Sequence, residues 1–164
     1  MKERAVNHST FVIERTYPAS PDRVFAAFAD PARKRRWFVE SGGHQVEHFE
    51  MDFRPGGREL TRLIFKQGTP VAGMTCISES AYDVIAPGSH IVFSNTMAIA
   101  GNTISAALVT VELQPLGSGT ELILTHQAAF FHGADGPEMR EHGWRTLMDL
   151  LGKELACVDE PQKA

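Results

Sequence analysis

The chain has 164 residues, of which 43% are hydrophobic and 22% are charged, and its formal net charge is −4 at pH 7. These values predict one folded domain over residues 1–164, with a core at about 9–158, and exclude a chain that is disordered throughout. The acidic balance disfavours a nucleic-acid partner, which usually needs an excess of basic residues. The basic run from Arg33 to Arg36 is interpreted as the solvated end of a short helix, with a patch for nucleic acid or acidic lipid as the alternative.

Three features predict a cytoplasmic protein with no membrane partner. Met1 is followed by charged and polar residues rather than by the apolar stretch of a signal peptide. No run approaches the roughly 18 apolar residues that a membrane span needs. Cys76 and Cys157 are far apart and form no C-x-x-C pair, so we expect two reduced cysteines.

The chain begins with a strand and two short helices. Residues 10–17 are rich in β-branched and aromatic side chains, which favours a strand. Ser20 and Pro21 are suited to the N-cap and the first position of a helix. Asp30 and Pro31 end that helix and open a second one over 32–37.

Six strands separated by short turns follow. Within residues 48–54, Phe49, Met51 and Phe53 alternate with polar residues, as in a strand with one buried face. A Pro-Gly-Gly turn then predicts a hairpin. The further strands are predicted over 58–66, 72–85, 89–98, 103–114 and 120–129. Short connections between successive strands predict an antiparallel meander.

A long helix is predicted over residues 137–158. One face of its helical wheel carries Gly143, Trp144, Leu147, Met148, Leu151, Leu155 and Val158. The opposite side carries Glu141, Arg145, Asp149, Gly152 and Lys153. Because the sheet is the only apolar partner of sufficient size, the first face should pack on it.

This order of elements resembles the START or birch-pollen-allergen superfamily, also called SRPBCC, whose fold is the helix grip. The more specific likeness is to the branch similar to the C-terminal domain of the activator of the heat shock protein 90 ATPase. It is carried by residues 15–38, 49–60, 110–127 and 141–155. The resemblance implies an α+β fold in the order β-α-α-β6-α, with a seven-stranded curved antiparallel sheet around the last helix and a cavity between them.

That cavity would bind a small hydrophobic molecule, such as a lipid, a polyketide or an aromatic compound. The candidate ligand-binding residues are Trp37, Phe49, Met51, Phe53, Phe93, Met97, His126, Arg140, Trp144, Leu147 and Met148. Aromatic and methionine side chains suit such a pocket, since they offer a large and adaptable surface. The alternative is that the same residues simply fill the core. A glycine in the middle of a helix needs a packing reason, so Gly143 would reflect either a close approach of the sheet or open space for a ligand.

Two polar residues have both a functional and a structural interpretation. His126 shares a strand face with Leu122 and Leu124, so it should point inward, where it could act as an acid or base or as a satisfied core histidine. Arg140 could bind a ligand carboxylate at the mouth of the cavity or could extend into solvent.

Other functions stay open as alternatives. One is a cyclase or hydrolase that uses His126, aided by Tyr82 or Arg140, although the sequence contains no established catalytic motif. Another is a co-chaperone that contacts a heat shock protein 90 homologue. A binding protein is favoured over an enzyme, and a homodimer is left open. No cofactor and no metal is expected, because His126, His132 and His142 lack the spacing of metal ligands.

Overall fold

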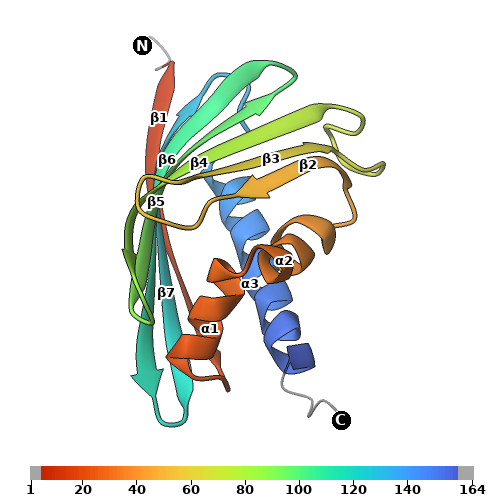
Figure 1. Ribbon diagram of the computed structural model, residues 1–164. Helices are drawn as coiled ribbons and strands as arrows, with labels where there is room; N and C mark the ends of the chain where they lie inside the picture. The colour runs from red at the N-terminus through yellow and green to blue at the C-terminus, as the bar shows by residue number, and fades with distance from the viewer. Residues whose placement is uncertain (1–4, 159–164) are drawn as a thin grey trace.

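The computed structural model describes residues 5–158 of the chain. Its strands and helices follow the predicted order (Figure 1). They are β1 (Val6–Tyr17), α1 (Pro21–Ala29), α2 (Pro31–Lys34), η1 (Arg35–Glu40), β2 (Gln45–Met51), β3 (Arg58–Ile64), β4 (Thr75–Ala86), β5 (His90–Ile99), β6 (Asn102–Leu116), β7 (Gly119–Phe131) and α3 (Pro137–Val158).

The seven strands form one antiparallel sheet in the order β1-β7-β6-β5-β4-β3-β2. Each pair of adjacent strands is consecutive in the sequence except β1 and β7, which pair along the whole length of β1. The sheet is curved, and α3 crosses its concave side, with α1 and α2 beside it (Figure 1). The predicted α+β helix grip is confirmed.

Several boundaries differ from the prediction: β1 begins at Val6 rather than at residue 10, and β4 begins at Thr75 rather than at residue 72. The second short helix covers only Pro31–Lys34 and continues as the wider π-helical turn η1. The strand predicted over 48–54 lies at Gln45–Met51, so Phe53 follows it instead of belonging to it. The hairpin closes early because the Asp52 amide already bonds the Arg58 carbonyl across the turn. Phe53 packs its ring instead on Tyr82, with 5.0 Å between centroids.

The apolar face of α3 lies on the sheet as predicted. Trp144, Met148, Leu151 and Leu155 are buried, and Leu147 is partly exposed at the edge of this face. The side chain of Val158 lies outside the described residues.

The two glycines of α3 have different environments: Gly143 has the open space that was one of its two predicted explanations, whereas Gly152 differs from the prediction. Gly143 is exposed, and a Cβ placed there meets no atom within 4 Å. Gly152, predicted to face away from the core, lies against Tyr17, and a Cβ there would be 3.3 Å from the ring. The Tyr17 hydroxyl also donates a 2.7 Å hydrogen bond to the Met148 carbonyl. The close approach between helix and sheet is therefore at Gly152.

Replacing each glycine by alanine should separate these two roles. Gly143→Ala should raise the free energy of unfolding by about 1 kcal/mol, because alanine favours helix and its Cβ enters open space. Gly152→Ala should gain clearly less, since Tyr17 must move while it is held by Met148. Chemical denaturation measures both variants, and equal gains would contradict this assignment.

Candidate functional site

The residues predicted to line a pocket separate into two groups. The first group is buried and belongs to the packed interior: Trp37, Phe93, His126, Arg140, Trp144 and Met148. The second group is partly exposed: Phe49, Met51, Phe53, Met97 and Leu147. Of the two groups, only the second offers surface that a ligand can contact without moving the core. A site formed by these residues lies toward the open side of the concave face and is not a fully enclosed pocket.

A band of small side chains crosses the concave face from β4 to β1. The strand register pairs Ser80 with Asn95, Asn95 with Ala107, Ala107 with Ala128, and Ala128 with Ser9. We call these five residues the small-residue band. The band spans four steps between strands, roughly 19 Å at about 4.8 Å per step. All five residues are partly exposed, although they face the helix side of the sheet.

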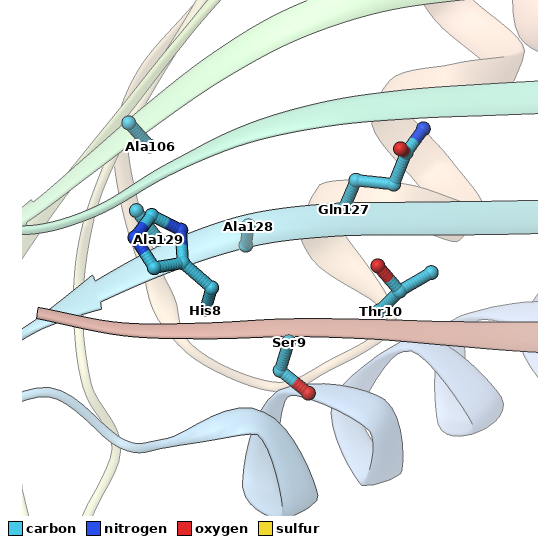
Figure 2. Close-up of a pocket in the computed structure, with 7 residues that line it drawn as sticks. All are labelled: His8, Ser9, Thr10, Ala106, Gln127, Ala128 and Ala129. Carbon is cyan, nitrogen blue, oxygen red and sulfur yellow. The ribbon is translucent and has the colours of Figure 1, made fainter.

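A neighbouring row of residues shows on which face of the sheet the band lies. The row two residues away on each strand is large and buried, and it contains Tyr82, Phe93, Val109, His126 and Phe11. Since alternate residues of a strand share a face, the band lies on the same side as this row. At the β1 end, Figure 2 shows Ser9 pointing toward the helix, opposite to His8 and Thr10.

One turn of α3 bridges the band. On one side of it, Trp144 lies against Phe93 and His126, with ring centroids 6.5 and 6.4 Å apart. On the other side, Arg140 donates a 3.0 Å hydrogen bond to Ser105 of β6. Gly143 precedes Trp144 and adds no side chain, and a Cβ there would meet no atom within 4 Å. One turn of α3 therefore lies across the small-residue band, and Ala107 of the band packs against the buried core.

His126 points inward, as predicted. It is 1% exposed, and its ring stacks on Phe11 at 4.5 Å. Its Nδ1 has no hydrogen-bond partner among the described residues. Burial lowers the pKa of His126 to about 4, and the positive charge of Arg140 acts in the same direction. The imidazole is therefore neutral at physiological pH.

Arg140 neither extends into solvent nor stays free for a ligand. It is 7% exposed, and its Nε and Nη2 donate 2.9 Å hydrogen bonds to the two carboxylate oxygens of Asp135. Its guanidinium also lies 5.2 Å from the centre of the Phe130 ring. This two-pronged pairing fixes the side chain and neutralises its charge within the fold.

Sequence reasoning missed a buried polar triad formed by Lys34, Glu59 and Tyr82. Lys34 Nζ lies 2.6 Å from Glu59 Oε2, and the Tyr82 hydroxyl donates to the same oxygen. Burial, together with the negative charge of Glu59, raises the pKa of Tyr82 well above its usual range. Lys34 Nζ also lies 4.8 Å from the centre of the Phe38 ring. The triad joins α2 to β3 and β4 at the deep side of the candidate site.

The basic run was therefore interpreted wrongly at one position. Arg36 is exposed, but Lys34 is 3% exposed and points into the domain. A possible signal was the position of Glu59, which alternation places on the concave face beside Thr61. A buried acidic residue needs a nearby cation.

Two hollows lie outside the concave face, and the lining of the first includes Ser9 and Ala128, the β1 and β7 members of the small-residue band. One, of about 270 Å³, is on the outer face of the sheet over β1, β6 and β7, and is lined by His8, Ser9, Thr10, Ala106, Gln127, Ala128 and Ala129 (Figure 2). The other, of about 200 Å³, adjoins the loop after β7 and is lined by Ala5, Asn7, Phe130, Phe131, His132, Gly133, Ala134 and Gly136. Both are open to solvent, whereas ligand sites usually bury most of a small molecule.

The geometry matches a known family. Residues 18–156 match the model for "Activator of Hsp90 ATPase homolog 1-like protein". The chain belongs to this family. Membership confirms the predicted resemblance and places the fold in the SRPBCC superfamily.

Solved structures of other members have the same architecture. Protein Mll3558 from Rhizobium loti is 48% identical, with a TM-score of 0.81 over 92% of this chain and 99% of that chain. A protein from Rhizobium leguminosarum is 32% identical, with a TM-score of 0.86 over 94% and 99%. DynU16, of the dynemicin biosynthetic locus, shares the fold alone at 20% identity and a TM-score of 0.60, over 90% of this chain and 47% of that one. No curated protein matches the chain.

Residues 5–158 contain neither a helix that could span a membrane nor a cluster of metal-binding side chains. No helix of residues 5–158 is both long and apolar enough to cross a membrane. In the same part of the chain, no group of three or more histidine, cysteine or acidic side chains could hold a metal ion.

The low pKa of His126 predicts a loss of stability in acid. As the pH falls below 6.5, the unfolded chain binds a proton at His126 that the folded protein does not bind, so the free energy of unfolding falls. By pH 4.5 this single group should cost about 2 to 3 kcal/mol. Denaturation at neutral and acidic pH should show that His126→Phe lacks this loss. The exposed-site variant His142→Gln should keep it, and an unchanged loss in His126→Phe would contradict the assignment.

The buried triad predicts a strong dependence of stability on charge pairing. Lys34→Met should cost about 3 to 5 kcal/mol, because it leaves the Glu59 carboxylate buried without its cation. Adding Glu59→Gln should recover part of this loss. The neighbouring control Arg35→Met breaks only the exposed pair with Glu40 and should cost less than about 1 kcal/mol. Equal losses in Lys34→Met and Arg35→Met would refute the role of the triad.

Proposed function

We propose that the protein binds one small hydrophobic molecule on the concave face, along the small-residue band beside the first turns of α3. The observation that carries this proposal is the band itself, a row of five small or short side chains on the helix side of the sheet whose residues are partly exposed. In a closed core, larger side chains would fill this space. Members of this family and fold commonly bind hydrophobic ligands, which supports the proposal.

The apolar residues around the band are suited to an oily ligand. Phe49 and Met51 on β2, Met97 on β5 and Leu147 on α3 are all partly exposed. Covering such surface contributes about 25 cal/mol per Å² of apolar area removed from water. Methionine side chains adapt to different ligand shapes, which favours moderate selectivity.

The enzyme alternative has less support. A catalytic histidine is usually oriented by a third group, and Nδ1 of His126 has no hydrogen-bond partner among the described residues. Its low pKa also makes it a weak base at physiological pH. A co-chaperone role remains an alternative that rests on the family name alone.

Filling the band should abolish ligand binding. Nile red, a neutral hydrophobic fluorophore, should bind the purified protein with one site and with enhanced emission. Ala107→Leu should weaken this binding at least tenfold, because the larger side chain enters the band. The matched control Ala106→Leu changes the neighbouring residue on the outer face and should bind as the wild type does.

Native mass spectrometry of the purified protein adds an independent readout. A co-purified small molecule that is retained by Ala106→Leu and lost in Ala107→Leu would support the proposal. Equal binding of Nile red by the two variants, with both folded, would show that the band is not the site.

A further inference from the structure

A fixed cluster of polar side chains lies at the β4–β5 end of the small-residue band. Asn95 Nδ2 lies 2.9 Å from Ser78 Oγ and 3.0 Å from Ser80 Oγ. It also lies 3.2 Å from the backbone carbonyl oxygen of Glu79. All three side chains are partly exposed on the concave face. They are therefore accessible to a molecule that lies along the band.

The Glu79 carbonyl fixes the orientation of the Asn95 amide. A carbonyl oxygen can only accept a hydrogen bond, so the amide nitrogen must face it, and Oδ1 must face another direction. Ser78 and Ser80 act as acceptors in their bonds with Asn95, which leaves their hydroxyl protons available. Among residues 5–158, neither Oδ1 nor these hydroxyl protons have a hydrogen-bond partner. The cluster thus presents one acceptor and two donors.

The charges around this cluster disfavour an anion. Glu59 is directly opposite Ser80 in the strand register, and its carboxylate is paired with Lys34. Arg140, which bonds Ser105 on the other side of the band, is paired with Asp135. Both cations are neutralised within the fold, so a ligand carboxylate would find the buried Glu59, the partly buried Asp135 and no unpaired cation between them.

We propose that Asn95, Ser78 and Ser80 recognise a neutral hydroxyl head group, and that the apolar body of the ligand lies along Ala107 and Ala128. The ligand class is then an alcohol or phenol with a hydrophobic tail. The ligand hydroxyl donates to Asn95 Oδ1 and accepts from a serine hydroxyl. This inference rests on the proposed function and adds the chemistry of the ligand to it.

Competition against bound Nile red tests the proposal with three probes of equal chain length. They are decanol, decyl methyl ether, which cannot donate, and decanoate at mildly alkaline pH, where it is ionised. Decanol should displace Nile red at about fivefold to tenfold lower concentration than the ether, since only decanol can donate the hydrogen bond to Asn95 Oδ1. Decanoate should be the weakest competitor.

Two variants identify the cluster as the cause. Asn95→Leu should remove the preference for decanol while the ether binds as before, and Asn95→Ala should do the same if Asn95→Leu does not fold. Ser78→Ala with Ser80→Ala should weaken decanol and the ether together, because both ligand oxygens lose the serine donors. Thr96→Val alters the next residue of β5, which is exposed, and should keep the preference.

The outcomes separate the two proposals. Equal competition by decanol and the ether, or strongest competition by decanoate, would overturn the head-group proposal while leaving hydrophobic binding intact. A preference for decanol that survives in the Asn95 variant would overturn it as well. Failure of Nile red to bind the wild-type protein would overturn the proposed function, and the head-group proposal with it.

Discussion

The helix α3 is fixed to the sheet by polar contacts at two points, and its position over the small-residue band depends on both. Near its start, Arg140 is held by Asp135 and Ser105. Two turns later, the Tyr17 hydroxyl binds the Met148 carbonyl. Ser105 lies near the start of β6 and Tyr17 at the end of β1, so the two contacts hold α3 near opposite ends of the strands that it crosses. For the binding site proposed above, a helix fixed in this way would avoid the cost of ordering it on binding.

The second support is the ionic triad under the other side of the site. Removing Lys34 and Glu59 from water is costly, and their mutual attraction offsets this cost only when hydrogen bonds satisfy the remaining polar atoms. Tyr82 provides such a bond. The triad holds α2 and the following turn η1 against β3 and β4. In η1, Trp37 contacts Phe38, and Phe38 in turn contacts Trp144 of α3. The polar interior therefore positions an otherwise apolar wall.

The sequence was sufficient for the architecture because local patterns specify strands and helices. Alternation correctly oriented His126, and the helical wheel correctly placed Trp144 on the sheet. Local patterns contain no information on which residues of separate strands become neighbours. The pairing of Ala107 with Ala128 and of Ser80 with Asn95 depends on the register of the complete sheet. The small-residue band was therefore invisible until the strands were aligned.

The same limitation explains the errors on single residues. A wheel shows which side of a helix a residue occupies but not how closely the partner approaches, so it left two explanations for Gly143 and missed the contact of Gly152 with Tyr17. The burial of Lys34 depends on Glu59, which lies 25 residues later. Likewise, Arg140 was left with two interpretations because its partner Asp135 lies in the loop before the helix, whose path no periodic pattern describes.

The pairing of β1 with β7 has a consequence for how the protein is made. The first strand finds its partner more than a hundred residues later, and until then the inner face of β1, with Phe11 and Ile13, has no neighbouring strand to its side. Contacts between such distant segments slow folding, because a long loop must close before they form. On the ribosome, the sheet can be completed only after β7 has emerged. The N-terminal segment must therefore remain unassembled through most of synthesis, which makes it the part of the nascent chain most exposed to aggregation.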